Sequence, residues 1–171
     1  MQIELLPAAA ADRPTFANLM QLFLYDLRDF GGPAPDQRGQ FVYPSLDPYW
    51  SGQDCHPFLI YADGALAGFA LIHRASRIHS PFDGHSFAAF FVLRGCRRAG
   101  VGSEAAMQLF DHFPGRWELA TPAANIPATA FWRSVSQRYT CGAYEEVWAT
   151  QSGWRGTIES FVAPPPCRSE P

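Results

Sequence analysis

The chain has 171 residues, 47% of them hydrophobic and 17% charged, a balance typical of a globular protein and not of a disordered one. Its formal net charge of −3, without any basic run, predicts that it does not bind nucleic acid, because such a surface needs clustered lysine and arginine. The longest apolar stretch, residues 87–93, is too short to cross a bilayer, so we expect no membrane partner.

The cysteine pattern indicates a reducing compartment. The four cysteines are scattered and form no Cys-x-x-Cys pair, which predicts free thiols and neither a disulfide framework nor a zinc site. The first residues also lack the basic start and apolar core of a signal peptide. We therefore expect a cytoplasmic protein without a bound metal. The cysteines are Cys55, Cys96, Cys141 and Cys167.

The N-terminal part of the chain predicts a strand, a helix, a long loop and a hairpin. Residues 2–6 are typical of a short strand, and a helix is expected from about Pro14 until Gly31-Gly32-Pro33 stops it. Residues 31–57 predict a long loop with one short helix near 47–50. Segments 58–62 and 67–74 flank Asp63-Gly64 and predict a β-hairpin. The apolar face of the helix consists of Phe16, Leu19, Met20, Phe23, Leu27 and Phe30.

The C-terminal part predicts a strand, a helix, a strand, a helix and a second hairpin. Residues 86–93 are apolar on both faces, so this strand is expected at the centre of a sheet. Helices are expected over about 102–113 and 127–138, with a strand at 117–121 between them. Strands near 144–150 and 157–162 pair across a Ser-Gly turn. The order predicts one α/β domain over residues 1–162 with a mixed sheet, and a disordered tail over 163–171.

The segment Arg97-Arg98-Ala99-Gly100-Val101-Gly102 lies between a buried strand and the first turn of a helix. The N-terminus of a helix exposes unpaired N–H groups and the positive end of its dipole. Glycines let the backbone approach an anion closely, and the two arginines add positive charge. This combination favours a pyrophosphate site. The alternative is that the glycines serve only a tight connection.

Two other phosphate-binding loops fit this segment poorly. A Walker loop needs a Gly-Lys-Ser/Thr sequence, which is missing here. A dinucleotide-binding fingerprint can be written as Gly100-x-Gly102-x-x-Ala105, but that fold needs a second βαβ half. Only 69 residues follow Gly102, and they end in a hairpin and a tail.

Residues 90–102, Phe-Phe-Val-Leu-Arg-Gly-Cys-Arg-Arg-Ala-Gly-Val-Gly, resemble the coenzyme-binding segment of the GNAT acetyltransferases. Asn125-x-x-Ala128-x-x-Phe131-Trp132 is similar to a second element of that family, a helix that borders the pantetheine arm. Within the family, the chain most resembles small bacterial members known only as predicted acetyltransferases. The resemblance implies an α/β, GNAT-like fold: a mixed, mostly antiparallel central sheet of six to seven strands flanked by about four helices.

The resemblance also implies an activity and a co-substrate. The chain would be an N-acetyltransferase that moves an acetyl group from acetyl-CoA to a primary amine of a small molecule or peptide, by direct attack. The backbone at Val92 and Leu93 would bind the pantetheine, and an amide near Val92 would polarise the thioester carbonyl. The remaining coenzyme-binding residues implied are Arg97, Arg98, Ala99, Gly100, Val101, Gly102, Ser103 and Asn125.

The chain departs from the family pattern at the proton-transfer positions. The family often has a carboxylate base on the central strand, where this sequence has Ala88 and Ala89, and a tyrosine acid where it has Trp132. An indole N–H donates a hydrogen bond but does not transfer a proton. Asp26 is a candidate replacement base and Tyr139 a candidate acid. The alternatives are a solvated helix carboxylate and a core aromatic ring, and a surface role is expected for Glu118.

The site that binds the acceptor amine is expected in the loops, which vary between members of the family. Aromatic rings there would contact an amine cation, or else they anchor the long loop. The sequence leaves open a homodimer, and it leaves open a second function, an acyl-CoA-binding regulatory module with little or no catalysis. The substrate-binding candidates are Asp29, Tyr43, Tyr49, Trp50 and Trp132.

Overall fold

The computed structural model describes residues 1–44, 46–52 and 54–165. Seven strands form one sheet in the order β1-β2-β3-β4-β5-β7-β6. All neighbouring strands are antiparallel except β4 and β5, which run parallel. The predicted mixed, mostly antiparallel sheet is therefore confirmed, with β4 at its centre as expected. The strands are β1 (Ile3–Pro7), β2 (Cys55–Ala62), β3 (Ala65–His73), β4 (His85–Val92), β5 (Gly115–Pro122), β6 (Glu145–Gln151) and β7 (Trp154–Ala163).

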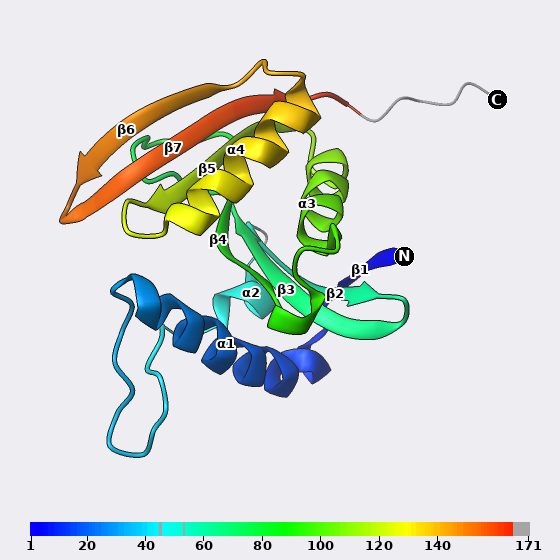
Figure 1. Cartoon of the computed structure of the whole chain (residues 1–171), viewed down its shortest axis with the longest axis vertical. Coiled ribbons are helices and arrows are strands. Elements are labelled where there is room, and N and C mark those ends of the chain that lie inside the picture. Colours follow the sequence, from blue (N-terminus) through cyan, green and yellow to red (C-terminus); the bar gives the residue numbers. More distant parts are fainter. Residues whose placement is uncertain (45, 53, 166–171) are drawn as a thin grey trace.

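Four α-helices flank the sheet (Figure 1). They are α1 (Arg13–Leu27), α2 (Pro48–Ser51), α3 (Val101–His112) and α4 (Ile126–Thr140). Helices α1 and α2 lie on one face of the sheet, whereas α3 and α4 cover the other. A 3-10 turn, Arg28–Phe30, extends α1 until Gly31 ends it with a φ of 82°. In the described part of the chain, no helix is long and apolar enough to cross a membrane.

The face under α1 includes most of the residues that the helical periodicity predicts, with Leu24 in addition and without Phe30. Phe16, Leu19, Met20 and Leu24 of α1 are buried. They pack on apolar side chains that alternate along the central strands, because every second residue of a strand points to the same face. These strand residues are Leu59, Phe69, Leu71, Ala89 and Phe91.

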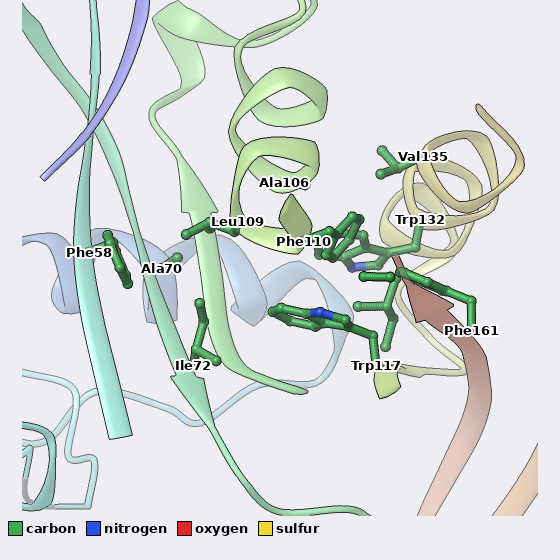
Figure 2. Packing of buried hydrophobic residues seen from close by; sticks show 12 residues of the cluster. Phe58, Ala70, Ile72, Ala106, Leu109, Phe110, Trp117, Trp132, Val135 and Phe161 are labelled. Carbon is green, nitrogen blue, oxygen red and sulfur yellow. The ribbon is translucent and has the colours of Figure 1, made fainter. Parts of the chain in front are cut away.

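An aromatic cluster occupies the opposite face, beneath α3 and α4 (Figure 2). Trp117 of β5 is fully buried, and its ring lies 4.9 Å from that of Phe110, measured between centroids. Its indole N–H donates to the carbonyl of Phe113 at 2.8 Å, so the polar atom is satisfied. Phe161 of β7 packs on Phe110 at 5.0 Å. This cluster joins α3 to β5 and β7.

The last strand runs further than expected in both directions. β7 begins at Trp154, directly after a turn in which Ser152 and Gly153 both have positive φ. It includes Ala163, which pairs with Gly115 and is buried, although the sequence places this residue in the tail. Residues 166–171 of the predicted tail, including Cys167, lie outside the described residues. The other three cysteines are free thiols.

Glu159 is a carboxylate buried under α4. It is 1% exposed, and neither of its oxygens has a hydrogen-bond partner in the described part of the chain. Burial raises the pKa of Glu159 to about 7, nearby Glu146 adds to the rise, and the side chains of Ser136 and Arg133 oppose it. The folded chain therefore binds this proton more tightly than the unfolded chain does.

Glu159→Gln is expected to change the pH dependence of stability. Because the folded-state pKa of Glu159 is raised, the wild-type free energy of unfolding should fall as the pH rises from about 4.5 to 7, by roughly 2–3 kcal/mol in all. The glutamine variant should lack this decline and be the more stable protein at pH 8. Urea unfolding across this pH range measures the difference. Glu145→Gln, on the exposed part of β6, is the matched control; a decline retained in Glu159→Gln would contradict the assignment.

Candidate active site

A cleft opens where β4 and β5 separate. The two strands pair only through His85 with Trp117 and Ser86 with Glu118, and beyond these residues they diverge (Figure 1). The resulting cleft has a volume of about 630 Å³. Its walls come from β4, β5, the C-terminal part of α1, the N-terminal half of α4, the loop at 74–84 and the turn between β6 and β7.

A β-bulge lies in the wall that β4 contributes. Leu71 pairs with Ala89 and Ile72 pairs with Phe87, so Ala88 is an additional residue without a partner on β3. Ala88 is exposed and lines the cleft. Bulges bend a strand and redirect its peptide groups, and they are common beside active sites. The bulge therefore turns an unpaired part of the β4 backbone into the cleft.

The two predicted pantetheine contacts, Val92 and Leu93, differ in the direction of their backbone hydrogen-bonding groups. The N–H of Leu93 donates to the carbonyl of Ala67, and its carbonyl accepts from Cys96, so Leu93 is not supported as a coenzyme contact. In an antiparallel ladder the peptide groups alternate in direction. Those of Val92 and Phe90 therefore point away from β3, towards the edge that β5 has left. Val92 is compatible with the predicted contact.

The arginine-glycine loop has the conformation of an anion site. Arg98 and Gly100 have φ values of 61° and 88°, and Gly100 is the N-cap of α3. The first intrahelical bond joins the N–H of Glu104 to the carbonyl of Gly100, so the N–H groups of residues 100–103 have no partner within the helix. These donors belong to the residues that the sequence analysis singles out. The loop fits a pyrophosphate.

Gly102 lies at the contact between α3 and α4. A Cβ atom at this position would be 3.3 Å from the ring of Phe131 and 3.4 Å from the side chain of Val92. The glycine therefore permits the close approach of α3 to α4 and to β4. Asn125 is the N-cap of α4, its side-chain oxygen accepts from the N–H of Ala128 at 3.2 Å, and it lines the cleft.

Asp26 holds the arginine-glycine loop of residues 97–102, called the coenzyme loop below, against α1. Its carboxylate accepts from the Nε of Arg94 at 2.9 Å and from the guanidinium of Arg97. Arg97 also donates from Nε to the carbonyl of Val92 at 2.7 Å. Asp26 is thus engaged in ion pairs and does not line the cleft, which does not support the predicted role as a base. Arg94 and Arg97 shape the loop through these bonds, and Arg98, which is also exposed, lies next to the unpaired amides.

Tyr139 lies in the aromatic core. Its hydroxyl donates to Asp111 at 2.8 Å, and its ring packs on Phe110 at 5.0 Å between centroids. Burial and this hydrogen bond raise the pKa of Tyr139, which makes it a weaker acid. It does not line the cleft. The structure therefore does not support Tyr139 as the proton donor.

Trp132 is the one substrate-binding candidate that lines the cleft. It is 8% exposed, and its ring stacks on Phe87 at 5.2 Å between centroids. The others lie elsewhere. Asp29 is exposed, at 3.8 Å from Arg94. Trp50 donates from its indole N–H to the carbonyl of Ala9 at 2.9 Å, which anchors α2.

Tyr43 and Tyr49 are partly buried and pack against the core beneath α1. Burial, followed by the nearby Cys55 thiol, raises the pKa of Tyr49 to about 12. Neither tyrosine lines the cleft. These rings anchor the long loop, which is the alternative that the sequence leaves open.

Glu118 is the functional candidate that sequence reasoning misses. The sequence suggests a surface role, but the side chain is 2% exposed and is the only carboxylate among the described residues that line the cleft. It accepts from the hydroxyl of Ser76 and, at 2.9 Å, from Arg116; His79 Nε2 is 3.4 Å away. The available signal was strand alternation, since buried Trp117 and Leu119 place Glu118 on the opposite face.

Solved structures share this fold. An acetyltransferase from Thermus thermophilus aligns with a TM-score of 0.68 at 14% identity, over 95% of this chain and 97% of its own. An aminoglycoside acetyltransferase in complex with coenzyme A gives 0.66 at 10% identity, over 94% and 95%. Spermidine N-acetyltransferase from Vibrio cholerae, in complex with CoA and spermine, gives 0.62 at 11%, over 95% and 96%.

No curated protein sequence matches the chain. The family model described as the acetyltransferase (GNAT) family matches residues 21–135, which include the cleft strands β4 and β5, the coenzyme loop and most of α4. Sequence family and fold agree: the chain belongs to the GNAT family of acetyltransferase enzymes.

Proposed function

We propose that the protein transfers an acetyl group from acetyl-CoA to a primary amine that enters the cleft between β4 and β5. The observation that carries this proposal is the cleft itself. One wall presents unpaired backbone at the Ala88 bulge, and the other presents a single buried carboxylate, Glu118. Two known members of the fold carry coenzyme A in their structures, which supports the choice of donor.

The residues at the N-terminal turn of α3 fit the coenzyme. The unpaired amides of residues 100–103 and the charge of Arg98 suit the pyrophosphate, and the absence of a Cβ at Gly102 lets this turn pack against Phe131 and Val92. The peptide group of Phe90 and the N–H of Val92, whose carbonyl already accepts from Arg97, suit the amides of the pantetheine arm. When bound, acetyl-CoA supplies an activated thioester.

The residues expected around the thioester explain how the amine would attack it directly. An unpaired N–H near Ala88 would donate to the carbonyl oxygen as negative charge develops on it. Glu118 would hold the incoming ammonium, accept its proton and so free the nitrogen lone pair for attack. The carboxylate retains acceptor capacity for this, because an ionised carboxylate has about four acceptor sites and the protein supplies three neighbouring donors.

No acid from the chain is needed to complete the reaction. A thiol has a pKa of about 8.5, so solvent can protonate the departing thiolate. This agrees with the placement of Tyr139 outside the cleft and with the inability of the Trp132 indole to transfer a proton.

Two measurements test the proposal. Coenzyme A at millimolar concentration is expected to raise the melting temperature, because a ligand that binds only the folded state stabilises it. Incubation with acetyl-CoA and a panel of primary amines is expected to release thiol and form acetylated amine. Absence of a melting shift would contradict the coenzyme site. A shift without transfer to any amine would instead favour a binding module.

A further inference from the structure

Arg77 is a cation in the cleft wall without an acidic partner. It belongs to the loop at 74–84, which runs behind β5 and β7 in Figure 1, and it is exposed. Its guanidinium carbon lies 5.4 Å from the centre of the Trp154 ring, at the start of β7. In the described part of the chain it forms no ion pair, whereas Arg116 pairs with Glu118. Both Arg77 and Trp154 line the cleft.

The surroundings leave the charge of Arg77 uncompensated. The other basic group in the cleft wall is His73, whose pKa is lowered by burial and then by Arg77, so it is neutral at pH 7. Glu118, the only carboxylate among the described residues of the cleft, pairs with Arg116 and is assigned to the substrate amine, so no carboxylate there compensates Arg77. A polycationic acceptor would therefore meet an excess of positive charge, while an anionic group beside the amine would be attracted.

The guanidinium is suited to bind a carboxylate. The cation–π contact with Trp154 uses no N–H hydrogen bond, so the donors at the edge of the guanidinium stay available to a ligand. These donors match the two oxygens of a carboxylate in a bidentate pair. Gln151, the last residue of β6, and Ser152, in the turn before Trp154, also line the cleft.

We propose that the acceptor is an amine that also bears a carboxylate, which Arg77 binds while Glu118 holds the amino group. This inference rests on the proposed acetyl transfer. A free amino acid and the C-terminus of a peptide offer the same chemistry, so both are included in the test.

The test compares matched acceptors that differ only at the carboxyl group. The pairs are lysine and its amide, β-alanine and its amide, and diglycine and its amide, each with acetyl-CoA. The measured quantity is kcat/KM from thiol release, with acetylated product identified by mass spectrometry. The wild-type protein is expected to prefer the carboxylate member of at least one pair by about 10- to 100-fold.

Arg77→Gln is expected to abolish this preference mainly through KM, while turnover of the amide member changes little. Comparing one pair between wild type and variant cancels the intrinsic reactivity of the amines. Arg155→Gln, which replaces an exposed arginine beside Trp154 that does not line the cleft, is the control and should retain the preference. Melting temperatures verify that both variants fold.

Equal reaction of acid and amide, or a preference that survives in Arg77→Gln, would overturn the carboxylate inference and leave acetyl transfer intact. Faster reaction of O-phosphoethanolamine than of β-alanine would also overturn it, in favour of a phosphate. If no amine in the panel is acetylated although coenzyme A binds, both the inference and the proposed transfer fail.

Discussion

Glu118→Gln is expected to lower kcat/KM for acetyl transfer by roughly 10²–10⁴-fold, the range typical for loss of a general base. The glutamine has nearly the same shape but does not accept a proton. It also removes the negative charge of a buried side chain, 2% exposed, that would hold the ammonium. Steady-state thiol release at saturating acetyl-CoA measures the effect.

Coenzyme binding should survive this change, because Glu118 lies on β5, away from the amides of residues 100–103. The melting shift with coenzyme A should therefore match that of wild type. Glu118→Asp keeps the charge but retracts it by one methylene group and should retain intermediate activity. Glu145→Gln on exposed β6 is the control. Near-wild-type turnover in Glu118→Gln would remove this residue from the chemistry.

Gly102→Glu is expected to weaken coenzyme A binding by at least about 100-fold. The new side chain starts 3.3 Å from the Phe131 ring, and it adds a negative charge to the helical turn whose amides are proposed to bind the pyrophosphate. Two unit charges 4 Å apart interact by about 4 kcal/mol at an effective dielectric constant of 20, and about 1.4 kcal/mol corresponds to a tenfold change in affinity. Titration calorimetry with coenzyme A is the measurement.

Gly102→Gln separates charge from bulk, because glutamine has almost the same size as glutamate. It should bind coenzyme A more weakly than wild type but clearly better than the glutamate variant, and the gap should narrow in high salt. Gly102→Ala adds only the Cβ and should be the mildest of the three. Equal affinities for the glutamine and glutamate variants would mean that no phosphate lies against this turn.

The coenzyme loop could be predicted because its properties are local. An anion site at the start of a helix needs only a strand, a turn with glycines at special φ angles and the unpaired amides of the first helical turn. All of these are encoded between Phe90 and Gly102, and the structure has α3 beginning at Val101. Asn125 was identified through its resemblance to a family motif, and the structure adds that it is the N-cap of α4.

Glu118, the carboxylate in the cleft, was missed because the residues that surround it come from segments far apart in the sequence. Glu118 is covered by Ser76 and His79, which are about forty residues earlier in the chain and reach it through the loop at 74–84. A charged residue in a strand is usually exposed, so the surface role was the ordinary expectation. Asp26 shows the opposite error: helical position suggested a base, whereas Arg94 and Arg97 make it an anchor for the loop.

The sequence by itself determined the family and the order of the elements, and it predicts the loop proposed for acetyl-CoA, since periodicity, turns and helix caps depend on neighbours along the chain. Only the tertiary structure decided the acceptor end. There β4 and β5 separate after two residue pairs, and Glu118 and Arg77 reach one cavity from a strand and a distant loop. Burial and charge compensation, which give these side chains their chemistry, arise only when such segments pack together.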